Sequence, residues 1–262
     1  MLTRHLATIA ALIAAASAAA AQSAAETAAQ HVAEGDTATD AMNAPAALKH
    51  YQAAIAVDSS YYPALWRASR EAVSLGEFDT SKVSQKSFYS MGETYGRRAV
   101  AADPKDTNGW FVLARAIGRN SLTLGKKERV KFAKEIREDA LTSLKYDSLN
   151  AGALHVMGRW NAEIMRLSGI SRFFAENFLG GEIFHAASWD SAVFYMQRAV
   201  KLDPDRLVHH LDLGEIYYDR DKGNDRALAK QELEFVVNGK DTEYNDENYK
   251  KEAAALLAKM KK

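Results

Sequence analysis

The amino-acid sequence predicts an all-α protein, built as an α-solenoid of stacked helical hairpins. The 262 residues are rich in Ala, Leu, Lys, Glu and Arg and include four prolines, while long alternating runs of β-branched residues are missing, a composition that favours helices over strands. Four segments also share one pattern, in which a helix ends at an Asp and the next helix begins a few polar residues later on a large side chain. Recurrence of this kind favours repeated hairpins over a single helix bundle.

The first 21 residues predict a secretory signal peptide, which would leave residues 22–262 as a single mature domain. A short basic start is followed by an apolar run to about Ala16 and by Ala19-Ala20-Ala21, which is the pattern of an A-x-A cleavage site. The chain has no cysteine, which excludes a lipoprotein anchor, disulfides and cysteine catalysis. No later segment approaches 18 consecutive apolar residues, so we expect an exported protein, in the periplasm or secreted, with no stable membrane span.

The helices are expected in pairs along the mature chain. Residues 23–34 and 45–57 predict the first hairpin. Second helices are expected to end at four aspartates that lie 45, 44 and 56 residues apart, namely Asp58, Asp103, Asp147 and Asp203. Residues 247–260 predict a terminal helix that seals the last repeat, because a stack of hairpins needs a cap where it ends.

Two acidic stretches near the C-terminus are expected to be connections. Residues 219–225, DRDKGND, are similar to a calcium loop, but the Gly is misplaced and no Glu stands at the twelfth position. We therefore expect the turn between the two helices of the last hairpin. Residues 241–248, DTEYNDEN, predict a solvated linker that ends in a helix cap.

Residues within these helices match the tetratricopeptide pattern, which is W-x2-L-G-x2-Y in a first helix and A-x3-F-x2-A in a second helix. Trp110 and Leu113 fit the first part, and Ala192, Met196 and Ala199 fit the second part. Small residues at these spacings let one helix approach its neighbour closely. The sequence therefore predicts tetratricopeptide-like hairpins.

The predicted repeats exceed the ordinary unit of about 34 residues, so we expect long helices and long inter-helix inserts. The additional residues fall between the two helices of a hairpin, at residues 77–90, 118–130 and about 166–189. In the last of these, an insert helix is predicted from four apolar residues at spacings of three and four, Ile170, Phe173, Phe174 and Phe178. It is too short to cross a bilayer, so we expect it to pack against the solenoid.

Residues 153–205 carry a more specific signal. They contain Gly158-Arg159-Trp160, then an insert that ends near Gly180-Gly181, and then an Ala-containing helix that closes on Leu-x-Pro. This region resembles the regulator of microtubule dynamics family of tetratricopeptide-like proteins. The resemblance implies an adaptor or scaffold without enzymatic activity, in some members associated with microtubules and membranes. Because an exported protein would not meet tubulin, only the fold and the binding character are carried over, and the partner stays open.

Stacked hairpins present their first helices on a concave surface, and the repeat register predicts which side chains face it. Equivalent positions in four first helices hold Arg70, Arg115, Arg159 and Glu215. One turn earlier on the same face lie Trp66, Phe111 and His155. A groove of this kind suits a partner segment with carboxylates, because guanidinium binds carboxylate in a two-pronged geometry. An alternative stays open, in which the arginines pair with Glu71, Glu163 or Glu215 and only hold the stack together.

The sequence therefore favours a non-enzymatic protein-interaction scaffold or adaptor of the cell envelope. One alternative is a carrier of lipid or another hydrophobic ligand, with residues 168–188 as a lid. Another is a cell-wall hydrolase with carboxylates drawn from Glu163, Glu176 and Glu182.

Several classes of function have no signal in the sequence. G-x-S-x-G, a phosphate-binding Gly-rich loop and an H-E-x-x-H pair are all missing, so we expect no catalytic residues, no metal and no cofactor. With 34 basic and 34 acidic side chains, the net charge gives no reason to expect binding to nucleic acid.

Overall fold

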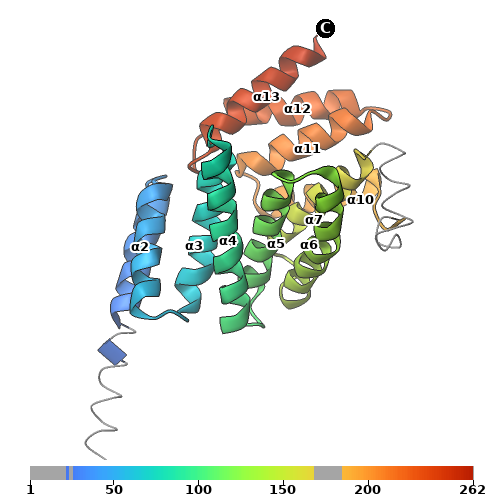
Figure 1. The fold of residues 1–262 in the computed structure, drawn as a ribbon. Helices are drawn as coiled ribbons and strands as arrows, with labels where there is room; N and C mark the ends of the chain where they lie inside the picture. Colours follow the sequence, from blue (N-terminus) through green and yellow to red (C-terminus); the bar gives the residue numbers. More distant parts are fainter. Residues whose placement is uncertain (1–21, 24–25, 168–184, 262) are drawn as a thin grey trace, which may run out of the picture.

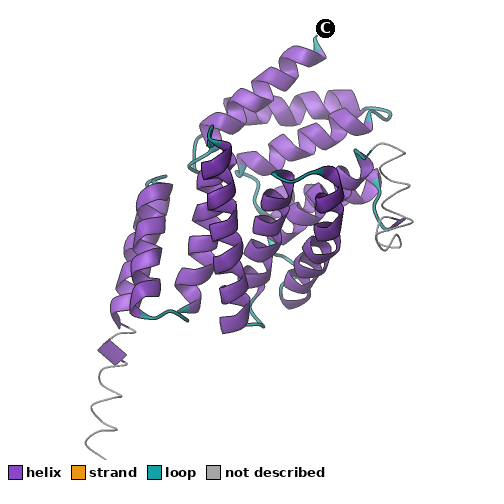
Figure 2. Cartoon of the chain, in the orientation of Figure 1, coloured by secondary structure: helices purple, strands orange, loops and turns teal. Residues whose placement is uncertain are grey.

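The structure, a computed structural model, describes residues 22–23, 26–167 and 185–261, and all regular structure in these ranges is helical (Figure 2). The predicted all-α solenoid is confirmed (Figure 1). Five hairpins follow one another: residues 26–40 with α2 (Ala44–Val57), α3 (Tyr62–Glu77) with α4 (Lys82–Ala102), α5 (Thr107–Leu122) with α6 (Lys126–Tyr146), α7 (Ala151–Met165) with α10 (Trp189–Leu202), and α11 (Leu207–Arg220) with α12 (Asp225–Asn238). The final helix is α13 (Asp246–Met260).

Two predictions fall outside the described residues. These are the signal peptide over residues 1–21 and the insert helix that carries Ile170, Phe173, Phe174 and Phe178. The glutamates Glu176 and Glu182, considered for a hydrolase, lie in the same stretch. Both predictions therefore stay predictions.

The four repeated aspartates end the second helices, as the repeat pattern predicts. Asp58, Asp103, Asp147 and Asp203 are the C-caps of α2, α4, α6 and α10, and each leaves the helical conformation. In the first three turns the Asp carboxylate then accepts a backbone N–H two residues on, for example from Ser60 to Asp58 at 2.9 Å and from Lys105 to Asp103 at 3.0 Å. An Asp at this position therefore stops the helix and builds the turn to the next hairpin.

Side-chain caps begin several helices. Ser81, Asp106, Asn150 and Ser188 each accept a backbone N–H in the first turn of α4, α5, α7 and α10. Such caps satisfy donors that have no partner within the helix. The cap at Ser81 starts α4 only a few residues after Glu77, where α3 ends. The additional residues of this repeat therefore lie mostly in α4 and not in a long loop.

The additional residues of the second and third hairpins lengthen helices more than loops. α4 and α6 have 21 residues each, whereas the turns that precede them are short, at residues 78–81 and 123–125. Most of residues 77–90 and of residues 118–130 are thus helical. The long inter-helix insert is the segment between α7 and α10, where residues 166–188 separate the two helices.

Small residues bring neighbouring helices into close contact, as expected. Gly96 on α4 faces α5, and a Cβ atom placed there would lie 3.0 Å from the Cα atom of Leu113 and 3.2 Å from its backbone nitrogen. Since both atoms belong to the backbone, no side-chain rotation can relieve the contact. Gly118 on α5 differs, because it lines the concave side and a Cβ atom added to it would meet nothing within 4 Å.

Replacement of Gly96 by Ala is expected to destabilise the protein by about 1–3 kcal/mol, because α4 and α5 must move apart. Gly118→Ala is the matched control and should be neutral or stabilising by up to about 1 kcal/mol, because Ala favours the helix and meets no neighbour. Urea denaturation of the two variants gives both values. Equal stabilities would show that α4 and α5 are not packed as closely as the structure has them.

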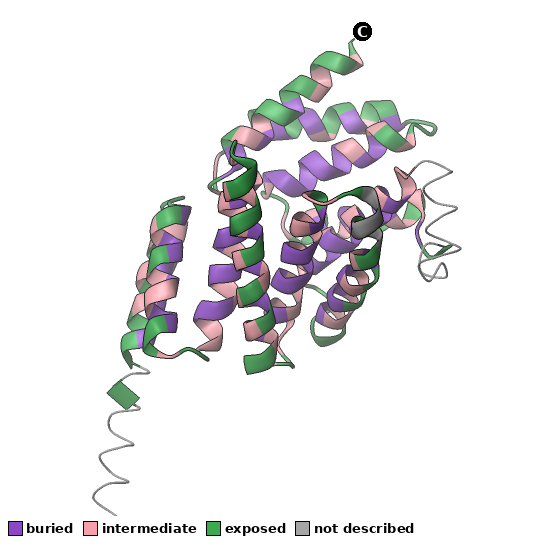
Figure 3. Ribbon diagram, in the orientation of Figure 1, coloured by how far each residue is buried: buried purple, intermediate pink, exposed green. Residues whose placement is uncertain are grey.

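The first helices form the inner layer of the stack, and the chain then turns across it. In Figure 1 the last three helices, α11 to α13, run across the direction of α2 to α7. α11 is buried on most of its surface (Figure 3), with ten of its fourteen residues in the interior. Because His209 and Asp212 are among them, this helix brings polar groups into the interior that need partners there.

Candidate functional site

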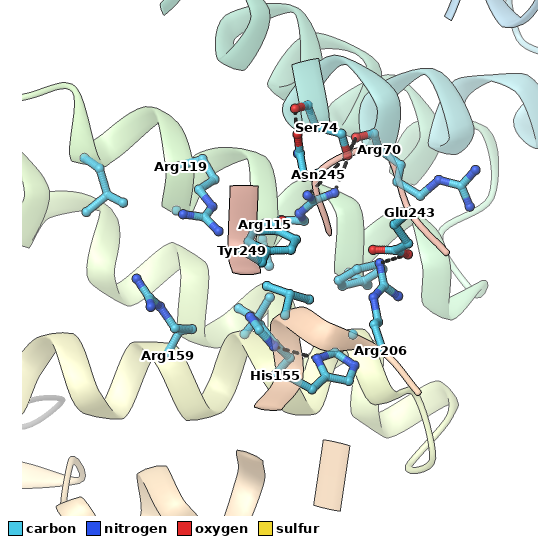
Figure 4. A pocket seen from close by; sticks show the side chains of 18 of the residues that line it. Arg70, Ser74, Arg115, Arg119, His155, Arg159, Arg206, Glu243, Asn245 and Tyr249 are labelled. Atoms are coloured by element: carbon cyan, nitrogen blue, oxygen red, sulfur yellow. Dashed lines mark hydrogen bonds and ion pairs between the residues drawn. The ribbon is translucent and has the colours of Figure 1, made fainter. Parts of the chain in front are cut away.

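The first helices border a cavity of about 390 Å³ on the concave side (Figure 4). Its walls come from α3, α5, α6, α7 and α11, from residues 39–44 of the first hairpin, and from residues 242–249 near the C-terminus. A volume of this size lies within the range of small-molecule sites and of pockets for anchoring side chains. The cavity is therefore the candidate functional site.

The predicted groove residues lie at or near this cavity. Arg70, Phe111, Arg115, His155 and Arg159 line it, which places five of the seven predicted side chains together. Glu215 lines a neighbouring cavity of about 180 Å³ that shares Arg159. Trp66 lines neither of these two cavities, and instead lies beneath the guanidinium groups of Arg67 and Arg70, whose carbons are 4.3 and 5.5 Å from its ring centroid.

Arg70 and Arg115 are bound to acidic groups of the protein itself. Arg70 lies 2.8 Å from Glu71 on the same helix. Arg115 on α5 reaches back to Glu77 on α3 at 3.3 Å, and Arg119 pairs with the same carboxylate. Burial alone would raise the pKa of Glu77, but Arg119 and Arg115 more than offset it and hold that pKa below its ordinary value. The pairs of Glu77 with Arg115 and Arg119 connect the second hairpin to the third.

Arg159 on α7 is the centre of a larger network. Its guanidinium lies 2.5 Å from Asp212 and 3.1 Å from Glu215 on α11, and 3.5 Å from Glu163 one turn away. Arg166 extends the network, at 2.8 Å from Glu163 and 2.6 Å from Asp219. The geometry of this region therefore agrees with the alternative in which the arginines hold the stack together.

The protonation of this network follows from its burial and its pairs. Burial alone would lower the pKa of Arg159, but Asp212, Glu215 and Glu163 raise it above its ordinary value. Burial would raise the pKa of Asp212, yet Arg159 and His155 hold it well below its usual range. For Glu215, burial prevails and the pKa is raised. Arg159 and Asp212 are thus a charged pair at neutral pH, with a side-chain exposure of 23% and 5%.

His155 and His209 form a chain that ends on Asp212. His155 Nε2 lies 2.9 Å from Asp212 Oδ2, and His155 Nδ1 lies 2.7 Å from His209 Nδ1. Burial lowers the pKa of both imidazoles, so both are neutral. Donation from His155 Nε2 to the carboxylate then requires His209 Nδ1 to donate to His155 Nδ1. The chain orients His155 at the cavity wall and contains no nucleophile that it could activate.

The C-terminal segment closes one side of the cavity, which corrects the expectation that residues 241–248 form a solvated linker. Asn245 is 4% exposed and Asp246 is fully buried. Asn245 donates to the backbone oxygen of Ser74 at 2.9 Å, across 171 residues of sequence (Figure 4). Glu243 pairs with Arg206 at 2.7 Å. The segment is thus part of the concave surface.

Tyr249, at the start of α13, reinforces this closure. It is 3% exposed, and its ring lies 5.4 Å from that of Phe78 in an edge-on arrangement. Burial, and then the charge of the nearby Glu77 carboxylate, raise the pKa of its hydroxyl, and the same carboxylate holds Arg115 and Arg119. The last helix therefore joins the second hairpin, far away in sequence, to the end of the stack.

Part of the cavity wall is apolar. Phe111 and Gly118 on α5, Ile136 on α6, and Val156 and Trp160 on α7 line this part. The Trp160 indole N–H donates to the backbone oxygen of Ala133 at 2.7 Å, so the ring presents only carbon to the cavity. The arrangement can hold an apolar group with polar contacts at one end.

Sequence reasoning missed several wall residues. Arg119 and Arg206 do not occupy the repeat position that identified the other arginines, and Thr242 to Tyr249 lie outside the repeats altogether. For Arg119 a signal was available, because it follows Arg115 by one helical turn on the same face.

Other sites have less support in the described ranges. Glu163, considered for a hydrolase, is paired with Arg159 and Arg166. The turn predicted within 219–225 is present as residues 221–224, between α11 and α12, with Asp221 and Gly223 at positive φ. Among the helices that the structure describes, none has the length and apolar character needed to cross a membrane. One group of side chains with metal-ligand character, His31, Glu34 and His50, lies on the first hairpin.

Comparison with solved structures shows the fold type. A thermophilic TPR protein from Thermus thermophilus is similar with a TM-score of 0.62 at 16% sequence identity, over 88% of this chain and 99% of that chain. The structure of PilF from Pseudomonas aeruginosa has a TM-score of 0.49 at 12% identity, over 91% of this chain and 93% of that chain. The first of these shows a tetratricopeptide-type fold, as predicted. No curated protein sequence matches the chain.

A family match covers nearly all of the described residues. The family described as regulator of microtubule dynamics protein 1-3 matches residues 26–261, from the first described hairpin to the end of the final helix. The resemblance seen around Gly158-Arg159-Trp160 is thereby confirmed. The chain belongs to the regulator of microtubule dynamics protein 1-3 family.

Proposed function

We propose that this protein is a non-enzymatic interaction scaffold of the cell envelope, which holds a short extended segment of a partner protein in its concave cavity. The observation that carries the proposal is the cavity of about 390 Å³ between the first helices and residues 242–249. The family membership and the stacked-hairpin fold support a binding role. The pattern of residues 1–21 supports the envelope as its location.

The shape of the cavity favours an extended segment over a helix. A helix with side chains is about 10–12 Å across, so it would need a groove that is open along its whole length. The C-terminal segment, held by Asn245 and Tyr249, blocks the path along which a longer helix could lie. One or two side chains of an extended chain fit the space.

The chemistry of the walls indicates what the segment carries. An apolar anchor suits the surface around Phe111, Val156 and Trp160. At the other end the arginines already have acidic partners, so a carboxylate on the partner must compete with Glu71, Glu77 or Glu243. We therefore expect an apolar side chain to supply most of the affinity and the polar rim to orient the backbone.

A photo-crosslinking residue at Leu122 tests the proposal in the native host, because Leu122 lines the cavity and is 36% exposed. Crosslinked partners from envelope and cytosolic fractions are identified by mass spectrometry, and the crosslinked segment is made as a peptide. Gly118→Phe fills the cavity without removing an ion pair, and should weaken peptide binding about tenfold or more. Val83→Phe adds the same side chain on an exposed face of α4 and should have no effect.

Two outcomes would contradict the proposal. Equal affinity of wild type and Gly118→Phe for the peptide would exclude the cavity as the binding site. Crosslinks to cytosolic proteins alone would exclude the envelope location and leave the binding role intact.

The apolar wall also suits the alternative function, that of a carrier for lipid or another hydrophobic ligand. A carrier would retain a lipid or a similar ligand through purification, which mass spectrometry of the intact protein under native conditions detects. Lipid that is present in wild type and lost in Gly118→Phe would favour a carrier over a scaffold.

A further inference from the structure

Three potential metal ligands converge on the first hairpin, away from the cavity. Glu34 Oε2 lies 3.0 Å from His50 Nδ1 and 3.2 Å from His31 Nδ1. The donor atoms of all three residues lie within 4.8 Å of one another. The two imidazole rings face the same carboxylate oxygen, with their centroids 6.5 Å apart.

The spacing of the donor atoms is close to that around one metal ion. Zinc binds imidazole nitrogen at about 2.0–2.1 Å and carboxylate oxygen at about 2.0–2.2 Å, so two such ligands at a tetrahedral angle lie about 3.3 Å apart. The observed distances of 3.0 and 3.2 Å from Glu34 to the two histidines differ from this value by a few tenths of an ångström. The donor atoms of the two histidines lie within 4.8 Å of each other, so rotation of these side chains would bring all three donors to the spacing around one ion.

The helices hold the three side chains in place. His31 and Glu34 are three residues apart on the helix of residues 26–40, and so share one face. His50 comes from α2, the antiparallel partner, and precedes the buried Tyr51. The two helices are joined by the hydrogen bond from Tyr51 to Asp36 at 2.7 Å. A ligand set that is already assembled loses less entropy when the metal binds.

The ligands are also accessible from solvent. The side chains of His31, Glu34 and His50 are 32%, 41% and 38% exposed, so an ion can enter and water can complete its coordination. Two imidazoles and one carboxylate form a ligand set that zinc uses in open sites. Imidazole also suits copper and nickel, whereas magnesium and calcium prefer oxygen ligands.

We propose that His31, Glu34 and His50 form a binding site for a divalent transition-metal ion of the zinc type, with water as a further ligand. The ion would connect the two helices of the first hairpin, next to the N-terminal edge of the stack. The inference is independent of the proposed function, because none of the three residues lines the cavity.

Calorimetric titration of the untagged protein with Zn²⁺ tests this site, since a histidine tag would itself bind the ion. We expect one strong site per chain. His50→Ala and Glu34→Gln should each lower the affinity about tenfold or more, because loss of a direct ligand should cost at least as much as the 10–100-fold loss seen for outer-shell partners. His185→Ala removes an exposed histidine elsewhere and should leave the affinity unchanged.

A second measurement separates this site from the buried histidine pair. Co²⁺ in place of Zn²⁺ gives an absorption spectrum that reports its ligands, and the band should disappear in His31→Ala and His50→Ala. Metal-free circular dichroism and melting curves must match wild type, which shows that the variants fold. The proposal is overturned if no stoichiometric site is found, or if the affinity and the Co²⁺ band are the same in wild type and His50→Ala.

Discussion

Arg159→Met is expected to destabilise the protein by about 3–5 kcal/mol. The substitution keeps much of the apolar length of the side chain and removes the charge, so it leaves Asp212 as a buried carboxylate without its nearest cation. Breaking a buried ion pair from one side carries a cost of this size, because the remaining charge stays desolvated. Urea denaturation followed by circular dichroism gives the free energy of unfolding.

Two further variants identify the source of the loss. In Arg159→Met combined with Asp212→Asn, both charges are gone and most of the stability should return. Arg97→Met is the matched surface control, because Arg97 also contacts two carboxylates, Glu93 and Glu135, each at 2.8 Å, but is 46% exposed. It should change stability by no more than about 1 kcal/mol. If Arg159→Met lost no more stability than Arg97→Met, the network around Arg159 would not be buried.

The pH dependence gives the same network a second signature. Asp212 has a pKa held well below its usual range, so its contribution is present above about pH 4, the region of an unfolded carboxyl group, and is lost as the pH falls toward the lowered value. In Arg159→Met, burial without the cation raises the pKa of Asp212, and acid relieves the strain of the unpaired charge. The stability gap between wild type and variant should therefore begin to narrow above pH 4, as the pH falls through the raised pKa of Asp212 in the variant, and should narrow further below about pH 4, where wild type loses its own contribution.

The repeat pattern predicted the parts of the structure that depend on local sequence. An Asp that caps a helix acts on atoms two to four residues away, so Asp58, Asp103 and Asp147 mark the same turn each time. Equivalent positions in successive hairpins then face the same side, which is why Arg115 and Arg159 line one cavity. The length of α4 was harder to predict, although Ser81 offers a cap signal.

Features that depend on the curvature of the whole stack could not be predicted in this way. The contact of Asn245 with Ser74 joins residues 171 positions apart. It forms only because the stack curves until the start of the last helix meets the second hairpin. Asp212 likewise becomes a buried partner of Arg159 only because several helices cover it, whereas the repeat register pointed to Glu215, three residues later on the same helix. The convergence of His31, Glu34 and His50 also needs the pairing of two helices, because no H-E-x-x-H spacing connects them.

Tyr249→Ala is expected to lose about 3–5 kcal/mol and to release the C-terminal segment from the concave surface. The loss follows from removing a buried aromatic ring that packs on Phe78. Hydrogen exchange should show which helices lose protection, because each hairpin in a stack is stabilised mainly by its immediate neighbours. Amides of residues 239–260 should lose protection most and those of α12 partly, while α2 at the far end should stay protected.

Two matched variants divide this loss between packing and hydrogen bonding. Tyr249→Phe keeps the ring and removes only the hydroxyl, so it should cost no more than about 1.5 kcal/mol. Tyr244→Ala removes a tyrosine that is 45% exposed in the same segment and should have little effect on stability. If Tyr249→Ala left the protection of residues 239–260 unchanged, the segment would be held by Asn245 and Glu243 alone. If protection is lost as expected, one side chain keeps the cavity closed on its C-terminal side, because the buried ring of Tyr249 packs the end of the chain against Phe78 of the second hairpin.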